Sequence, residues 1–201
     1  MEQSTDMRLF LAPSDVIDWV HPDIRALASR LANSESDHRR IARRCFEWVR
    51  DKVEHSVDFG RAEVTCKASE VLAHRTGFCY AKSHLLAALL RANGVPAAFC
   101  YQRLSVDGTG PPFCLHGLNA VWLPEFGWYR VDARGNKAGV TAEFTPPIER
   151  LAFSVRVPGE ADLLAILPEP LPDVVQALRQ YEEAHVLAAN LPDQAPVAAG
   201  I

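Results

Sequence analysis

The chain has 201 residues, of which 48% are hydrophobic and 23% are charged, so it can bury a core without needing disulfides. Its formal net charge is −4 with acids and bases intermixed, and its arginine-rich stretch at 39–44 has acidic neighbours, which argues against nucleic-acid binding. The first fourteen residues lack the pattern of a signal peptide, and no segment reaches the roughly 20 apolar residues of a membrane span. We therefore expect a cytoplasmic protein with no membrane or nucleic-acid partner.

The first sixty residues are predicted to be helical. Ser-Asp pairs at 14–15 and 36–37 can cap a short first helix and a third helix, and Pro22 can open a second between them. Apolar residues recur at helical spacing in the second and third of these segments. They are Ile24, Leu27 and Leu31, and then Ile41, Cys45, Trp48 and Val49.

Residues 65–135 are predicted to alternate between helix and strand. A short helix begins near Ser69, and a longer one runs from Cys79 to about Ala92, where Asn-Gly and then Pro stop it. A strand at 97–104, a Gly/Pro-rich loop at 107–112 and two strands at 115–123 and 128–133 follow. A turn at 124–127 joins the last two strands.

The remaining residues, 136–201, are predicted to form a loop through Pro146-Pro147, a short helix at 161–166 and a longer helix from Pro172, with a frayed tail after Pro192. We expect one domain over 1–201. Its parts are a helical region (1–60), a core region (65–135) that holds the candidate catalytic residues described next, and a C-terminal loop and helix (136–201).

Cys79 occupies a position where a thiol can become a nucleophile. It lies in the first turn of an apolar helix, where unpaired N–H groups and a partial positive charge favour a thiolate and can hold an oxyanion. Gly77 would leave room for a substrate carbonyl. Cys79 also shares the inward face of Leu86 and Leu90, so a purely structural role is the alternative.

His116 and Asp132 are predicted to face each other across a hairpin. Alternation puts His116 on one face of its strand and Asp132 on the same face of the next. A turn centred near residues 124–125 places the two directly opposite or one diagonal step apart, within reach of a hydrogen bond. A carboxylate that orients an imidazole beside a thiol is the arrangement of nucleophilic catalysis. The alternative is a core histidine satisfied by an Asp at a strand end.

The segment from Arg75 to Ala97 resembles the nucleophile segment of transglutaminase-like domains, including bacterial transglutaminase-like cysteine proteases. It shows Gly-x-Cys and then a helix ending in Leu-Leu-Arg-x-x-Gly-Val-Pro-Ala. The segment 116–132, with Gly-Trp before Val-Asp, resembles the His and Asp strands of that family. The likeness covers roughly residues 65–135.

The resemblance implies a papain-like α+β fold in which the nucleophile helix packs on an antiparallel sheet. It makes Cys79 the nucleophile, His116 the general base and acid, and Asp132 the residue that orients the histidine. It also implies an oxyanion donor upstream of the nucleophile, which the segment 55–67 could supply. His116 is followed by Gly-Leu-Asn, where many relatives have an aromatic residue two positions on.

We expect this site to attack an amide carbonyl of a peptide, protein or small amide through a thioester, without a cofactor. Hydrolysis is favoured over crosslinking, because the chain is short and has no acidic cluster for calcium. The alternatives are a catalytically silent scaffold and a thiol-based metal or redox protein. A zinc site would use the residues Cys66, Cys79, Cys114 and His116, but these lack the close ligand pair of most zinc sites, so we expect no bound metal.

Overall fold

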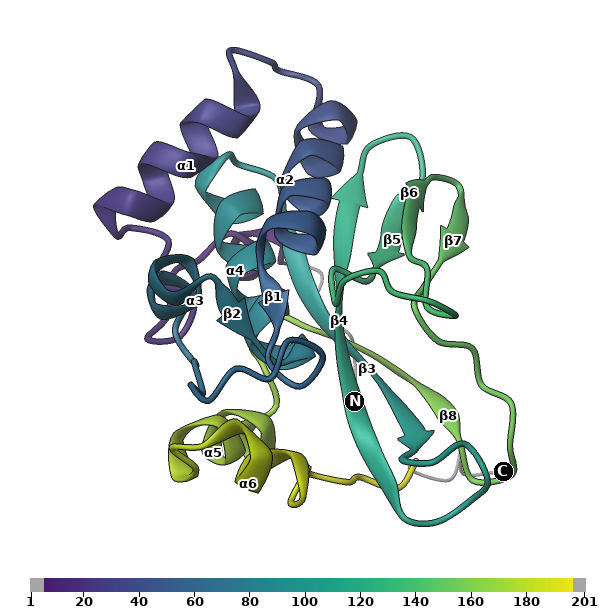
Figure 1. Ribbon diagram of the computed structural model, residues 1–201. Helices are drawn as coiled ribbons and strands as arrows, with labels where there is room; N and C mark the ends of the chain where they lie inside the picture. Colours follow the sequence, from purple (N-terminus) through teal and green to yellow (C-terminus); the bar gives the residue numbers. More distant parts are fainter. Residues whose placement is uncertain (1–5, 197–201) are drawn as a thin grey trace.

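The computed structural model describes residues 6–196. Helices pack against one face of a four-stranded antiparallel sheet, which is the α+β arrangement predicted above (Figure 1). The helices of this layer are α1 (Pro22–Ala32), α2 (His38–Lys52), α3 (Ala68–His74) and α4 (Cys79–Ala92). α4 and α2 contact the sheet, and α1 and α3 pack on α4. The strands run in the order β5 (Gly127–Val131), β4 (Phe113–Leu123), β3 (Ala97–Ser105) and β8 (Ala161–Leu167).

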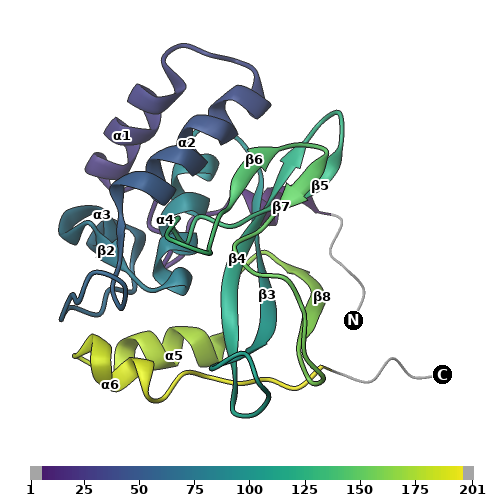
Figure 2. The same ribbon diagram turned by 45° about the vertical axis from the view of Figure 1, so that its right-hand side comes forward.

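Helix α4 lies at the centre of the helical layer, with α1, α2 and α3 around it and the sheet beside it (Figure 2). Its residues from Cys79 to Arg91 are all buried, including the polar Lys82 and His84. A helix that is surrounded by protein on all sides can have apolar residues on every face. The run of Leu and Ala residues in α4 has this composition. None of the helices within residues 6–196 is both long enough and apolar enough to span a bilayer.

The predicted second and third helices are confirmed, whereas the predicted first helix is wrong. Pro22 opens α1, and the Asp37 carboxylate caps α2 by accepting a 2.8 Å hydrogen bond from the Arg39 N–H. Ser14 instead closes a turn with Ile17, because its hydroxyl accepts from the Ile17 N–H and its own N–H donates to the Ile17 carbonyl. The turn puts Ile17 in the core without a helical run.

The hairpin of β4 and β5 has the register that the sequence predicted. Trp122 pairs with Trp128, and Asn119 pairs with Val131, which is the last pair of the ladder. Asp132 follows directly after β5, so the strand ends two residues earlier than predicted. The part of β4 before Asn119 therefore has no β5 neighbour.

The predicted helix at 161–166 is a strand, β8, which pairs antiparallel with β3. Its Ala and Leu residues favour a helix locally, but pairing with the edge of β3 outweighs this small preference. The loop through Pro146-Pro147 also contains a short hairpin of β6 (Glu143–Thr145) and β7 (Ile148–Arg150).

Part of the opposite face of the sheet is covered by a 3₁₀ helix near the N-terminus, η1 (Met7–Phe10). Phe10 is buried there, and its ring centroid lies 4.7 Å from that of Trp128. It joins a small core formed by Ala98, Cys100, Leu118 and Ala120. The two faces of the central strands are thus both buried.

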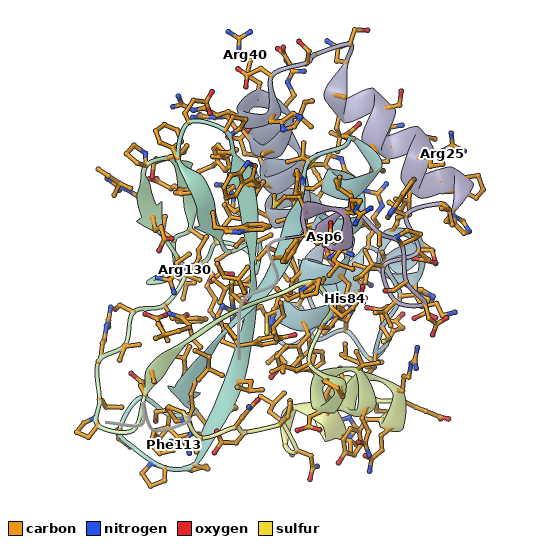
Figure 3. The ribbon with its side chains drawn as sticks, turned by 180° about the vertical axis from the view of Figure 1, so that it is seen from behind. Asp6, Arg25, Arg40, His84, Phe113 and Arg130 are labelled. Carbon is orange, nitrogen blue, oxygen red and sulfur yellow. The ribbon has the colours of Figure 1, made fainter. Side chains whose placement is uncertain are left out.

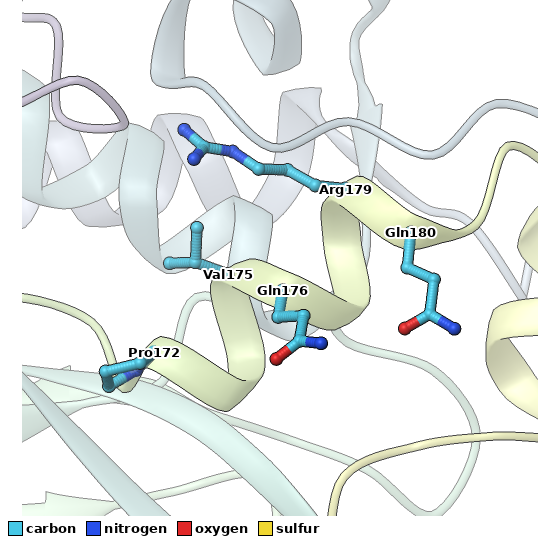
Figure 4. A pocket seen from close by; sticks show the side chains of 5 residues that line it. All are labelled: Pro172, Val175, Gln176, Arg179 and Gln180. Carbon is cyan, nitrogen blue, oxygen red and sulfur yellow. The ribbon is translucent and has the colours of Figure 1, made fainter.

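The predicted C-terminal helix is two helices, α5 (Pro172–Gln180) and α6 (Ala184–Ala188). The chain is extended between them, because Glu183 forms an antiparallel bridge with Glu63 and the Ala184 N–H donates to the Ala62 carbonyl. A depression on α5 is lined by side chains from that helix alone (Figure 4). They are Pro172, Val175, Gln176, Arg179 and Gln180, none of which is a predicted site residue.

The chain just after α6 is held against the sheet, where the sequence predicted fraying. The Leu115 N–H donates to the Pro192 carbonyl at 2.7 Å, and the Arg103 guanidinium makes two 2.6 Å bonds to the Asp193 carboxylate. The remainder of the predicted tail, 197–201, lies outside the described residues. This contact brings residues 192–193 beside the strand that carries His116.

Gly117 allows α4 to approach β4 closely. A Cβ at this position would lie 2.8 Å from Tyr80 Cδ1 and 3.3 Å from Tyr80 Cα. We expect Gly117→Ala to lower the free energy of unfolding by about 1–3 kcal/mol, because the overlap forces the helix and strand apart. Chemical denaturation measures this change, and an unaltered midpoint would show that the contact is not tight.

Candidate active site

Cys79 is the first residue of α4, as predicted. Its side chain is buried except for a small exposed part (9% for the residue), and Phe78 precedes it in an extended conformation as the N-cap. The Phe78 carbonyl accepts the first helical hydrogen bond from the Lys82 N–H at 2.9 Å. The N–H groups of the first turn, which have no partner within the helix, are therefore at the same end of α4 as the thiol.

Gly77 does not have the role that the sequence suggested. A Cβ there would lie 3.0 Å from Ala81 Cβ and 3.0 Å from Thr65 Oγ1. The space beside Gly77 is thus filled by the protein, and glycine serves the packing of β2 (Thr76–Gly77) against α4. Room for a substrate carbonyl must come from elsewhere around Cys79.

His116 and Asp132 form a buried hydrogen-bonded pair. His116 Nε2 lies 2.7 Å from Asp132 Oδ2, and both side chains are almost inaccessible to solvent. The register puts the two residues one diagonal step apart, and the bend after Val131 brings the carboxylate to the ring. His116 Nδ1 is left free to face another group.

The Asp132 carboxylate is held at both oxygens. Besides His116, Oδ2 accepts a 3.1 Å bond from the Ala152 N–H, and Oδ1 accepts a 3.1 Å bond from the Arg134 N–H. Burial by itself would raise the pKa of Asp132, but the charge of His116 and these hydrogen bonds hold that pKa below its ordinary value. Asp132 is therefore an anion in a fixed orientation.

Cys79 and His116 come together at the part of β4 that extends beyond β5. Burial opposes the charged form of His116, but the charges of Asp132 and Cys79, together with the hydrogen bond to Asp132, raise its pKa to about 10. The contact is set by α4, because the Tyr80 hydroxyl bonds to the Leu115 carbonyl next to His116. The structure thus brings all three predicted site residues into one cluster.

Several side chains around this cluster were not predicted. The ring of Phe153 stands edge-on to the His116 ring, with centroids 5.0 Å apart and planes at 89°, and the Arg134 guanidinium lies over Phe153. Both come from loops whose course the sequence does not indicate. Their residue types carry no signal by themselves, and only the contacts of Phe153 with His116 and of Arg134 with Phe153 identify them.

Lys82 is a second unpredicted feature, since its charge is buried in α4 one turn after Cys79. Its ammonium donates to the carbonyls of Val53 and Arg50 at the end of α2. Burial, with the charge of Arg134, lowers the pKa of Lys82 to about 7. Lys82 therefore ties α4 to α2 and lies near Asp132 without bonding to it.

His55 is a further buried ring, and it lies beside Phe78, the residue before Cys79. It lies in the two-residue strand β1 (Glu54–His55), which pairs in parallel with β2, and its ring centroid is 5.8 Å from that of Phe78. Its Nδ1 has no hydrogen-bond partner, and burial with the charge of Arg134 lowers the pKa of His55 to about 3. His55 is thus neutral at physiological pH.

His84, which lies in α4 like Cys79, is a buried histidine with a structural role (Figure 3). Its Nδ1 lies 2.7 Å from the Cys66 carbonyl, and its ring stands edge-on to Phe99. Burial lowers the pKa of His84 to about 4, so this ring is neutral, whereas His116 is a cation. The difference is the carboxylate, which only His116 has.

A depression in the surface borders the site on the sheet side. Phe153, which contacts His116, is part of its lining, as are Gln102 on β3 and Arg130 on β5. Gln102 is the cross-strand neighbour of His116, and both Gln102 and Arg130 bond to Asp162. None of the three residues of the cluster lines this depression itself, and Phe153 lies between it and His116.

The cysteines do not assemble the zinc site considered above. Within residues 6–196, no three side chains of His, Cys, Asp or Glu are grouped so that they could hold a metal ion. All five cysteines are free thiols. The residues that come together at Cys79 are a base and a carboxylate.

Comparison with known proteins agrees with this architecture. A model of the transglutaminase-like superfamily matches residues 25–133, more than half of the chain. The chain is similar in structure to a candidate cysteine protease from Cytophaga hutchinsonii, with 22% identity over 66% of this chain and 43% of that one and a TM-score of 0.53. It also matches the periplasmic domain of TgpA from Pseudomonas aeruginosa, with 23% identity, 63% and 47% coverage and a TM-score of 0.46.

The chain spans less than half the length of either of these solved chains, and no curated protein matches it. The likeness to the first solved structure shows a shared fold. The family match covers α2, α3, α4 and the strands β3, β4 and β5, which carry the cluster of Cys79, His116 and Asp132. The chain belongs to the transglutaminase-like superfamily.

Proposed function

We propose that this protein is a cysteine-dependent enzyme that hydrolyses an amide bond, with Cys79 as nucleophile, His116 as general base and acid, and Asp132 as the orienting residue. One observation carries the proposal: a buried, 2.7 Å His116–Asp132 pair stands beside a thiol at the start of a helix. Each member has the environment that its role requires.

The reaction begins with attack of the Cys79 thiolate on the carbonyl carbon. A C–S bond forms, and the carbonyl π electrons move to the oxygen, where N–H groups of the first turn of α4 stabilise the negative charge. The imidazolium of His116 gives its proton to the amide nitrogen as the C–N bond breaks. The amine leaves, and a thioester on Cys79 remains.

Water then completes the cycle. His116, now neutral, takes a proton from water as the oxygen attacks the thioester, and the C–S bond breaks to release a carboxylic acid and restore the thiolate. If an amine took the place of water, a new amide would form. The partly buried position of Cys79 favours a small or extended substrate over a folded protein surface, so we favour peptide and amide hydrolysis over crosslinking.

Selective alkylation tests the nucleophile without knowledge of the substrate. Burial raises the pKa of the other four thiols, to about 11 for Cys66 and Cys114 and about 12 for Cys45 and Cys100. We expect iodoacetamide to label Cys79 at least tenfold faster than any of these at pH 7, because the thiolate is the reactive form.

Peptide mapping after brief labelling measures the order of reaction. His116→Ala is the matched control, because it removes the base and leaves all five thiols, and it should slow labelling at Cys79 alone. Labelling of Cys114 or Cys66 before Cys79 in the native protein would contradict the proposed nucleophile.

A paired substrate screen tests the reaction type. Fluorogenic peptide amides report hydrolysis, and a dansylated primary amine with a glutamine-containing protein reports transfer. We expect the first to give turnover that Cys79→Ala lacks. Turnover only with the amine acceptor would assign transamidation. If neither assay shows turnover and iodoacetamide does not label Cys79, a catalytically silent scaffold would be favoured.

A further inference from the structure

Arg134 links the two sides of the proposed active site. Its backbone N–H donates to Asp132 Oδ1 at 3.1 Å, on the side of the sheet. Its guanidinium makes two bonds to the Asp58 carboxylate, of 2.5 and 3.0 Å, on the side of the helices. A single residue therefore joins the carboxylate that orients His116 to the segment in front of α4.

Asp58 is in turn connected to the nucleophile through a short and well-bonded path. It lies in the turn after β1, which the Phe59 N–H closes by donating to the His55 carbonyl. His55 pairs with Gly77, and the Ser56 N–H donates to the Gly77 carbonyl at 3.2 Å, two residues before Cys79. A displacement of Asp58 would therefore be transmitted to the start of α4.

The geometry of the Asp58–Arg134 pair makes it a stiff link. Arg134 is 8% exposed and the Asp58 side chain 14%, and two parallel bonds between planar groups determine their relative orientation as well as their distance. Lys137 adds a 2.7 Å bond to Asp58 Oδ1. Removing one partner of a poorly hydrated pair leaves a charge without compensation.

Arg134 also supports the His116 ring from a second direction. Its guanidinium carbon lies 5.5 Å from the centroid of Phe153, and Phe153 packs edge-on against His116. Arg134 thus acts on His116 both through Asp132 and through Phe153. The plain alternative is an ion pair that only fastens the loop after β1.

We propose that Asp58 and Arg134 form a clamp that holds the His116–Asp132 pair at the correct distance from the Cys79 thiol, so that both are positioning residues for the proposed reaction. The inference rests on the proposed function for its meaning in catalysis. The clamp itself is tested by the reactivity of the thiol, which needs no substrate.

The pH dependence of Cys79 alkylation separates positioning from charge. Asp58 faces Arg134, Lys137 and His55, and Lys82 of α4 also interacts with its charge. His116 faces Asp132 and Cys79, and His55 also interacts with its charge. If Asp58 contributed only a negative charge, Asp58→Asn would make the site more positive and move the half-maximal alkylation rate to a lower pH. If the clamp holds the His116 imidazolium beside the Cys79 thiol, Asp58→Asn moves the pH of the half-maximal alkylation rate upward.

We expect Asp58→Asn in the full chain to slow iodoacetamide labelling of Cys79 about tenfold near pH 7 and to move the midpoint of the profile upward. Where a peptide substrate is turned over, kcat should fall about ten- to hundredfold with KM little changed, because displaced catalytic groups cost this much. Asp58→Glu, which keeps the carboxylate, should restore part of both.

Asp15→Asn is the matched control. Asp15 also accepts bonds from one arginine and one lysine, Arg179 and Lys67, but none of these touches Cys79, His116 or Asp132. Its labelling profile should equal that of the unaltered chain. If Asp58→Asn does not fold, as thermal unfolding would show, Arg134→Lys tests the clamp by removing the paired bonds while keeping the charge.

A folded Asp58→Asn or Arg134→Lys protein with an unchanged profile, or with a midpoint moved to lower pH, would overturn the clamp. Absence of turnover in the unaltered protein would count against the proposed function, but the labelling profiles would still decide the clamp.

Discussion

Replacing Cys79 with alanine will abolish amide hydrolysis while leaving the fold intact. No other group in the cluster can form the thioester, so kcat should fall by about 10⁴-fold or more, to the background rate. Alanine favours a helix, and the change removes only one sulfur atom from a residue at the edge of the core, so the free energy of unfolding should change by no more than about 1 kcal/mol. Fluorogenic peptide assays and denaturant unfolding measure the two quantities.

Cys114→Ala is the control for this experiment. Cys114 precedes His116 by two residues on the same strand, so it is close in the fold but has no role in the proposed reaction. It should retain turnover. If the protein instead worked as a metal or redox centre through several cysteines, the two variants would lose function together. Unchanged turnover in Cys79→Ala would refute the mechanism outright.

Asp132→Asn should cost nearly as much as the loss of the nucleophile. The amide group has the same size, but it can donate a hydrogen bond to His116 Nε2, which stabilises the tautomer with its proton on Nδ1. That tautomer cannot accept the proton of the thiol, so we expect kcat to fall by about 10³–10⁴-fold. The Arg134 and Ala152 N–H groups also lose part of their acceptor.

The same variant should change the pH dependence. In the unaltered protein, the pKa of His116 is raised to about 10, against about 6.5 in the unfolded chain, so its imidazolium persists well above neutral pH. Its contribution to stability is fully present below about pH 6.5 and is lost as the pH rises through about 10. Without the carboxylate, both the alkaline limb of the rate profile and this loss of stability should move to lower pH.

A comparison with Asp162→Asn isolates the role of Asp132. Asp162 is a carboxylate on the same sheet that bonds to Gln102 and Arg130 but to none of the three proposed catalytic residues. That variant should keep the alkaline limb of the unaltered protein. An Asp132→Asn protein with the same limb as Asp162→Asn would mean that Asp132 does not set the charge state of His116.

The sequence alone predicted the local parts of the proposed site. The helix that begins at Cys79 could be predicted because its start and its Asn-Gly-Val-Pro end are both local signals. The diagonal placement of His116 and Asp132 could be predicted because a hairpin with a short turn leaves few registers, and side chains alternate with period two. The family resemblance rested on these same segments.

Tertiary structure decided what depends on distant partners. Residues 161–167 have helix-forming side chains, but they form β8 because their backbone pairs with the edge of β3. Residues 181–183 interrupt a predicted helix because Glu183 pairs with Glu63. The Asp58–Arg134 pair joins positions 76 residues apart, and no local pattern encodes such a contact. Local propensities are worth tenths of a kcal/mol per residue, so pairing and burial override them wherever the two conflict. Local sequence therefore specified the proposed nucleophile and its partners, whereas only the tertiary structure determined which residues hold them in place.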